Sequence, residues 1–119
     1  MVHKETDIYI AEVRQAAPDT DDLTLIGERL SAGEIVQLES VFIIDLDAKA
    51  KVVRLGYDRA GTKFWIRRNA IGTNDYDLPL TRPIILVENE APCGMVESPG
   101  SGEECLLVAR GFYREVHKA

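Results

Sequence analysis

Apolar and polar residues alternate with a period of two in the clearest segment of the chain. Across residues 36–46 every even position except one serine is apolar, whereas the odd positions include Gln37 and Glu39. This period is typical of a strand with one buried face, and it fits a helix poorly because it would scatter apolar residues around the cylinder. Val41 and Ile43 interrupt the polar face. We therefore expect a loop or a partner to cover them.

Short apolar stretches separated by turn-forming residues make up the rest of the chain. The further predicted strands cover residues 6–13, 23–26, 51–57, 62–67, 76–80, 84–88, 93–97 and 104–113. Asp58-Arg59-Ala60-Gly61 predicts a four-residue hairpin loop, with glycine where a positive φ is needed. Pro79 and Pro83 predict an edge or bulged strand, because proline cannot donate to a ladder. The nearly unbroken apolar run in 104–113 is typical of a central strand covered on both faces.

These patterns predict the fold class and the domain organisation. We expect one all-β domain over residues 1–119, built as a two-sheet antiparallel sandwich or jelly roll of about eight short strands. A small barrel is the alternative. Residues 1–7 and 113–119 are expected to form extended arms.

Composition and charge narrow the classes of function. The chain has 119 residues, which fits one modest core, and its formal net charge is −6. A nucleic-acid partner is not expected, because phosphate binding needs a positive field. No apolar run approaches the roughly 20 residues of a membrane helix, and the N-terminal residues lack the apolar segment of a secretion signal. We expect a protein made in a cytoplasm, with no membrane partner.

The usual catalytic and metal-binding patterns are missing from the sequence. Both histidines, His3 and His117, lie within three residues of an end of the given chain, and no nucleotide-binding or nucleophile motif occurs. Aspartates cluster at residues 19, 21 and 22, at 45 and 47, and at 75 and 77. Calcium is an alternative there, but turn formation is the preferred interpretation. We therefore predict no enzyme activity, no cofactor and no metal.

Two cysteines, Cys93 and Cys105, occur in apolar and strand-like surroundings. Two is too few for a disulfide scaffold, and we interpret both as small buried hydrophobic residues in a reducing compartment. A disulfide between them is the alternative, because they flank one predicted hairpin.

One basic and aromatic segment departs from the acidic background. We call Lys63, Trp65, Arg67 and Arg68 the basic aromatic strip. If Phe64 and Ile66 face the core, then Lys63, Trp65 and Arg67 face outward and offer an interface anchor or a stacking platform for a sugar. Two alternatives stay open. In the first, Trp65 faces the core and Phe64 faces a neighbouring subunit. In the second, Lys63 and Arg67 protect an edge strand from pairing with another chain.

Four segments in the middle of the chain follow one another in a distinctive order. They are Leu30-Ser31-Ala32-Gly33-Glu34, the run from Val52 to Ile66, Pro79-Leu80 through Leu86, and Pro99-Gly100-Ser101-Gly102-Glu103-Glu104. They include an apolar strand ending in Arg-Leu-Gly, a Gly-Thr hairpin, an aromatic return strand and a Gly-Glu loop, and a late hydrophobic strand follows. In this order the chain resembles, over roughly residues 30–110, small β-sandwich virion proteins of tailed phages. The resemblance implies a structural role without catalytic residues.

The sequence thus predicts a non-enzymatic virion component, made in the host cytoplasm and placed as a capsid decoration (cement) protein. Its expected partners are capsid or tail proteins and further copies of itself, and self-association would bury Val41 and Ile43. A head-tail or tail component is one alternative. A module that binds carbohydrate or protein through Lys63, Trp65 and Arg67 is another. An enzyme or metal-dependent protein is the third.

Overall fold

A computed structural model describes residues 7–46, 51–71 and 79–114 of the chain. Within these ranges, the side chains of residues 45, 51, 67–71 and 79–81 are also left out of the description. The described residues form eight strands in two four-stranded sheets. The expected all-β, two-sheet antiparallel sandwich is therefore confirmed.

The two sheets are built from nested antiparallel pairs. The strands are β1 (Ile8–Ala16), β2 (Leu23–Ile26), β3 (Ile35–Asp45), β4 (Lys51–Arg59), β5 (Thr62–Ile71), β6 (Pro79–Leu86), β7 (Glu90–Val96) and β8 (Glu104–Arg114). β4 pairs with β5, β3 with β6, β2 with β7 and β1 with β8, so the chain is one long folded ribbon. Winding this ribbon gives sheet A, ordered β1-β8-β3-β6, and sheet B, ordered β2-β7-β4-β5. This strand order is that of a jelly roll.

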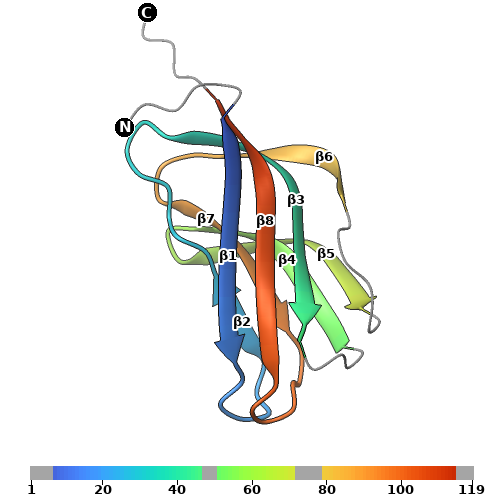
Figure 1. The fold of residues 1–119 in the computed structure, drawn as a ribbon. Coiled ribbons are helices and arrows are strands. Elements are labelled where there is room, and N and C mark those ends of the chain that lie inside the picture. Colours follow the sequence, from blue (N-terminus) through green and yellow to red (C-terminus); the bar gives the residue numbers. More distant parts are fainter. Residues whose placement is uncertain (1–6, 47–50, 72–78, 115–119) are drawn as a thin grey trace, which may run out of the picture.

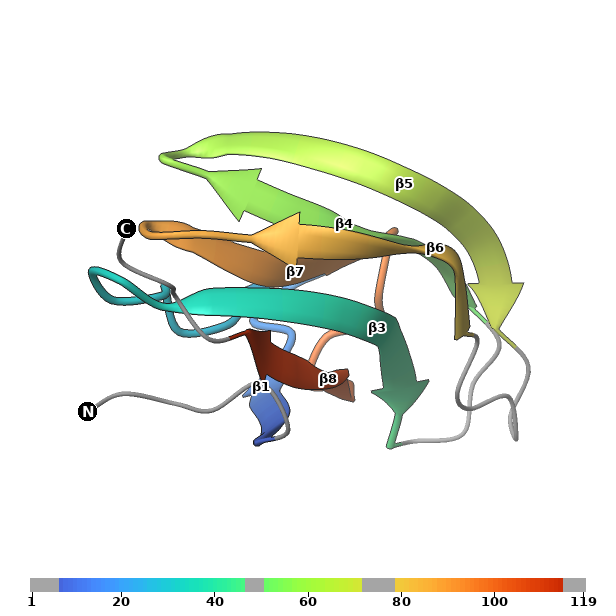
Figure 2. The same ribbon diagram turned by 90° about the horizontal axis from the view of Figure 1, so that it is seen from above.

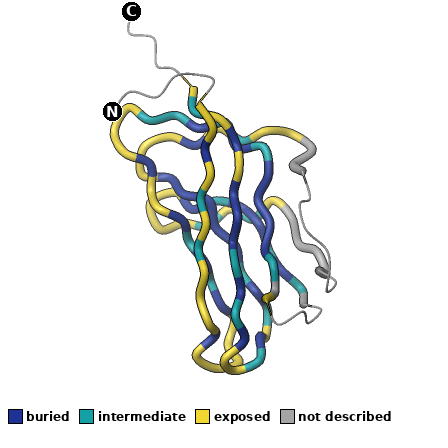
Figure 3. The backbone as a smooth tube through the Cα atoms, viewed as in Figure 1, coloured by how far each residue is buried: buried dark blue, intermediate teal, exposed yellow. Residues whose placement is uncertain are grey.

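The sheets lie face to face, with sheet A in front in Figure 1 and β5 at the far side in Figure 2. Leu25, Leu38, Leu55, Leu86 and Leu107 are almost completely buried between them. Each burial removes apolar surface from water, which is the main favourable contribution to folding. β1 is an edge strand and is mostly exposed, whereas the middle of β8 is buried (Figure 3).

The strand predictions are right in kind and differ in detail. The two segments predicted at 76–80 and 84–88 are replaced by the single strand β6, and the residues before Pro79 lie outside the described part. β6 is an edge strand, as Pro79 and Pro83 predict, and β8 is central, as its apolar run predicts. The hairpin loop is shorter than expected. Arg59 pairs with Thr62, so only Ala60 and Gly61 form the turn, both with positive φ.

A β-bulge in β3 reverses which residues face the core. Leu38 pairs with Gly111 of β8 but Ser40 pairs with Arg110, so Glu39 is an extra residue. The core positions are even before the bulge and odd after it. Val41 and Ile43 are 0% and 1% exposed and belong to the core.

The prediction that Val41 and Ile43 lie on an outer face is therefore wrong. They contribute to the core of their own chain and are not available to a loop or partner on the outer face. The even-numbered residues after the bulge, Phe42 and Ile44, take the outer side. The physical reason is that one inserted residue shifts every later side chain to the opposite face.

Two glycines make room for the bulges. Gly111 lies opposite the bulge at Glu39, and Gly56 lies opposite a second bulge at Ile66 in β5. A Cβ atom on Gly111 would overlap the carbonyl oxygen of Gln37, and one on Gly56 would overlap that of Phe64. Only glycine permits this close backbone approach.

Three connections end in the same turn. In each, the N–H of the first residue donates to the carboxylate of a glutamate three positions later, and the glutamate N–H donates to the carbonyl of the first residue. The pairs are Ser31 and Glu34, Val87 and Glu90, and Gly100 and Glu103. The residue before each glutamate, Gly33, Asn89 or Gly102, has a positive φ. These turns lead directly into β3, β7 and β8.

Replacing Gly111 should be far more damaging than replacing a glycine with free space around it. We expect Gly111→Ala to lower the free energy of unfolding by about 3 kcal/mol, because the new methyl group overlaps the backbone of β3. Gly33→Ala is the control. Its Cβ would meet nothing within 4 Å, so only the positive φ of 81° opposes it, at about 1 kcal/mol. Urea denaturation measures both, and equal losses would contradict the steric argument.

Candidate interaction surfaces

The basic aromatic strip does not form one exposed surface. Lys63 pairs with Asp58 and Trp65 with Gly56, which places both on the face of sheet B that points away from sheet A. Both are half-buried. The bulge at Ile66 then shifts the alternation before Arg67, so the strip is interrupted. The side chains of Arg67 and Arg68 lie outside the described residues.

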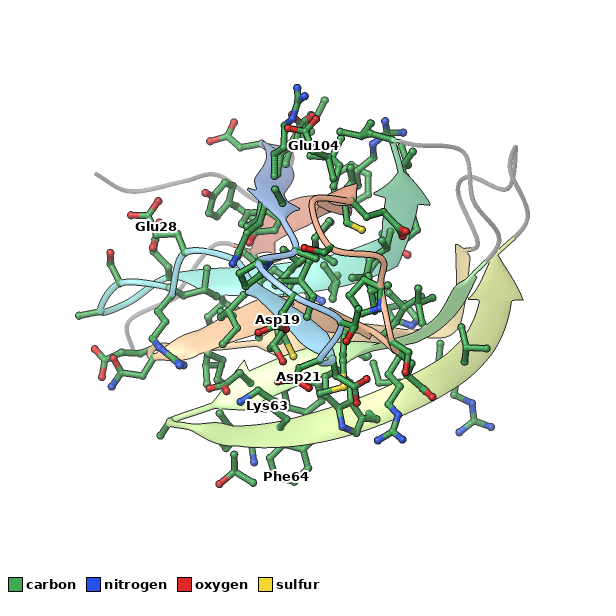
Figure 4. All side chains as sticks on the ribbon, turned by 90° about the horizontal axis from the view of Figure 1, so that it is seen from below. Asp19, Asp21, Glu28, Lys63, Phe64 and Glu104 are labelled. Carbon is green, nitrogen blue, oxygen red and sulfur yellow. The ribbon has the colours of Figure 1, made fainter. Side chains whose placement is uncertain are left out.

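The alternate residues of β5 are more exposed than Trp65. Phe64 pairs with Tyr57, stacks on it with ring centroids 5.2 Å apart, and still leaves 40% of its surface exposed because β5 is an edge strand. Arg59 lies over both rings. In Figure 4, Lys63 and Phe64 are labelled on this edge of the molecule. The exposed aromatic group of β5 is therefore Phe64.

A buried carboxylate fixes the charged side chains at the β4–β5 hairpin. Asp58 is 0% exposed, and its Oδ1 accepts hydrogen bonds from Arg29 Nη1 at 2.7 Å and from the Gly61 N–H at 2.9 Å. Lys63 Nζ lies 3.6 Å from Asp58 Oδ2. A second buried carboxylate, Glu90, pairs with Arg59. Lys63 therefore serves an internal ion pair and is not a free cation for a partner.

The ionisation of Asp58 follows from these contacts. Burial opposes its charge, but the hydrogen bonds from Gly61 and Arg29 and the charges of Arg29 and Lys63 outweigh it, so the pKa of Asp58 is lowered. The carboxylate stays ionised and acts as a hydrogen-bond acceptor. This arrangement stabilises the hairpin, and near neutral pH Asp58 is an acceptor and not a proton donor.

Exposed apolar side chains form a row on the outer face of sheet A. Ile8 pairs with Phe112, Phe112 pairs with Gln37, and Gln37 pairs with Ile85, so apolar side chains of β1, β8 and β6 lie along one line, with the polar Gln37 of β3 between Phe112 and Ile85. Ile8, Phe112 and Ile85 are 68%, 42% and 46% exposed, and Ile10 beside them is 58% exposed. We call Ile8, Ile10, Ile85 and Phe112 the outer apolar row. Clustered exposed apolar side chains are typical of interaction sites.

A polar pocket lies beside β1, at the open side of the sandwich. Its volume is about 350 Å³, and it is lined by β1, by Tyr113 of β8 and by the connector between β2 and β3. Tyr9 and Tyr113 meet edge to face with centroids 5.5 Å apart. The Tyr9 hydroxyl is buried and has no hydrogen-bond partner among the described residues. Burial raises the pKa of Tyr9 to about 12, and the charges of Glu34 and Glu28 add to the effect.

The remaining candidate residues have ordinary structural surroundings. Asp19 Oδ1 accepts the N–H of Asp21, and Asp22 Oδ1 accepts that of Ser98, as turn-forming aspartates do. Residues 47, 75 and 77 and the side chain of residue 45 lie outside the described part. In the described residues no group of three or more His, Cys, Asp or Glu side chains is placed to hold a metal ion.

The cysteines lie on strands of different sheets, Cys93 on β7 and Cys105 on β8. Both are buried thiols, so the alternative of a disulfide between them is not found. Burial raises the pKa of Cys93 to about 11, with a contribution from Asp58. A thiol that keeps its proton is a poor nucleophile.

The predicted arms are only partly testable. Tyr113 and Arg114 belong to β8 and pair with β3, and the Tyr113 N–H donates to the Asp7 carbonyl. An arm that begins at residue 113 is therefore wrong for these two residues. Residues 1–6 and 115–119 lie outside the described part.

Comparison with models of known protein families finds no match, and comparison with curated proteins finds none either. In the parts of the chain that the structure describes, no helix is long and apolar enough to cross a membrane.

Acid should weaken the hairpin through Asp58. The folded-state pKa of Asp58 lies below its ordinary value. The ionised carboxylate therefore contributes its full stabilisation to the folded protein above the ordinary pKa, and this stabilisation is lost as the pH falls through the folded-state pKa. We expect the free energy of unfolding of Asp58→Asn to fall less than that of the unchanged protein between pH 5 and pH 2. Urea denaturation across this range measures the difference. Asp21→Asn, an exposed control, should keep the original pH dependence.

Proposed function

We propose that the chain is a non-enzymatic structural component of a phage virion, and that it acts as a capsid decoration protein through protein–protein contacts. The outer apolar row is the observation that supports this most. Four exposed apolar side chains on one sheet face cost solubility, and burying them against a partner recovers favourable free energy.

The fold and the described sites are compatible with this proposal. Jelly rolls are frequent in viral capsid proteins, although they also occur in lectins and cupins, so the fold alone does not decide the function. The sequence resemblance to small phage virion proteins points the same way. The buried carboxylates Asp58 and Glu90 are engaged in ion pairs that stabilise the fold.

A carbohydrate-binding role is less favoured. It would use Trp65 as an exposed stacking platform, but Trp65 is half-buried and Lys63 beside it is paired with Asp58. The face of β5 that carries Trp65 is therefore not an open aromatic platform.

A head-tail or tail component of the virion would use the same kind of protein–protein contacts as a decoration protein. The number of copies per particle distinguishes these two alternatives.

The copy number in purified particles tests the proposal directly. We expect on the order of hundreds of copies per particle when the chain is quantified against the major capsid protein by mass spectrometry, because decoration follows shell symmetry. About a dozen copies or fewer would instead place it in the tail or connector. Absence from particles would contradict a virion role.

A charge in the outer apolar row should abolish docking without unfolding the protein. Ile8 is 68% exposed, so Ile8→Glu should change the free energy of unfolding by less than about 0.5 kcal/mol. The same change should weaken binding to particles lacking this chain by at least about tenfold, because the carboxylate would be buried without a partner. Co-sedimentation measures binding. Ile66→Glu, at an isoleucine of sheet B that is 45% exposed, is the control and should bind normally.

A further inference from the structure

Among the edge strands of the two described sheets, β1 is the one without an interruption. Of the other three, β6 carries Pro79 and Pro83, β5 is bulged at Ile66, and β2 has only four residues. All nine residues of β1 pair with β8 without a register shift, and none of them is proline or glycine. A long and regular edge strand of this kind is a place where a further strand can pair (Figure 1).

The backbone groups of alternate residues of β1 point away from β8. The Tyr113 N–H donates to the Asp7 carbonyl, and the Ala17 N–H donates to the Glu103 carbonyl. Because bonded residues alternate along an antiparallel pair, the odd-numbered residues of β1 bond to β8, and the even-numbered ones present their N–H and C=O groups at the outer edge. The connector beside this edge is held to the other sheet, since the Leu30 N–H donates to a carbonyl of β7.

The sequence of β1 is complementary to itself in one antiparallel register. In a two-fold pair, even-numbered residues must lie opposite even-numbered ones, because only these have backbone groups at the outer edge. Centring the pair on Glu12 or on Arg14 would place like charges opposite each other. Centring it on Ile10 or Ala11 would place Glu12 opposite an isoleucine. Centring it on Val13 places Glu12 opposite Arg14 of the second copy, twice by symmetry, and opposite charges at such positions stabilise a strand pair.

The side chains that this register brings together are accessible on the outer face of sheet A. Glu12 is exposed, and the Arg14 side chain is 62% exposed although its Nη2 lies 2.5 Å from Glu104 Oε2. Arg14 would therefore lie between Glu104 of its own chain (labelled in Figure 4) and Glu12 of the second copy. On the same face, Ile10 would lie opposite Ala16 of the second copy, and both are exposed in the single chain.

We propose that two copies of this chain pair through β1, antiparallel and centred on Val13. The segment Ile10–Ala16 of one copy lies beside the same segment of the other, and the two four-stranded A sheets join into one continuous sheet. Residues that oppose each other in paired strands share a face, so the outer apolar rows of both copies lie on the same side of the joined sheet. The dimer does not depend on the virion role, and it would give a docking protein two equal contact surfaces.

Sedimentation equilibrium of the full chain between about 1 µM and 1 mM tests the proposal. We expect a reversible monomer–dimer equilibrium with a Kd of about 10–100 µM, because an edge-strand contact is small. A chain that stays monomeric over this range would overturn the proposal and would leave the β1 edge to a strand of a different protein.

Charge reversal tests the register. Glu12→Arg and Arg14→Glu should each raise the dimer Kd at least about tenfold, because like charges then oppose each other twice. An equimolar mixture of the two variants, one of them fluorescently labelled, should pair nearly as well as the unchanged chain, because each new charge faces an opposite charge on the other variant. Arg82→Glu makes the same charge change at an exposed arginine of β6, the other edge strand of sheet A, and should leave the Kd unchanged.

Two controls separate this dimer from unfolding and from contacts of the outer apolar row. The urea midpoints of Glu12→Arg and Arg14→Glu should stay close to that of the unchanged chain, since exposed ion pairs contribute little to stability. Ile8 lies beyond the paired segment, so Ile8→Glu should leave the dimer Kd unchanged even where it abolishes docking to particles. A dimer that Ile8→Glu disrupts, or one that the mixed charge variants fail to restore, would contradict pairing through β1.

Discussion

The extra residue at Glu39 decides which side chains of β3 enter the core. Leu38 before the bulge and Ile43 after it both face sheet B, although strict alternation would place them on opposite sides. Gly94 of β7 lies directly opposite, where a Cβ would come within 2.7 Å of Ile43 Cδ1 and 3.1 Å of Leu107 Cδ1. The bulge on one sheet and the glycine on the other together set how closely the sheets pack.

The bulge also determines what the outer face of sheet A offers. Because Val41 and Ile43 turn inward, they are not exposed on this face, and its most exposed apolar side chains lie at the other end of the sheet. Arg110 lies over the Phe42 ring, with its guanidinium carbon 5.7 Å from the centroid, and Phe42 is 4% exposed. The outer apolar row has no such cover, since Ile8 and Ile10 are more than half exposed. On the outer face of sheet A, the most exposed apolar side chains therefore lie on β1, at Ile8 and Ile10.

The sequence predicted those features that depend on local pattern. The class of the fold, the edge position of β6 and the central position of β8 follow from alternation, proline and apolar runs. The three turns closed by Glu34, Glu90 and Glu103 also leave a local signal in the sequence, a Gly or Asn directly before each glutamate.

The two bulges were not predictable in the same way. A one-residue insertion leaves composition and apolar content unchanged, and it shows only when the partner strand fixes the register. Ile66 and Glu39 are both ordinary strand residues in sequence. The pocket was missed for a different reason, because Tyr9, Glu28 and Tyr113 come together only through the winding of the jelly roll. The sequence also favoured Trp65 over Phe64 as the exposed aromatic group. Phe64 is the more exposed because it lies on an edge strand, and the position of a strand within its sheet is fixed only by the folded topology.

Comparing Ile43→Ala with Ile44→Ala by urea denaturation tests the reversal of β3 most directly. Ile43 is 1% exposed and belongs to the core, whereas Ile44 is half-buried on the other face. The structure predicts a loss of about 2–5 kcal/mol for Ile43→Ala and a clearly smaller loss for Ile44→Ala. A larger loss for Ile44→Ala would restore uninterrupted alternation along β3 and contradict the bulge at Glu39.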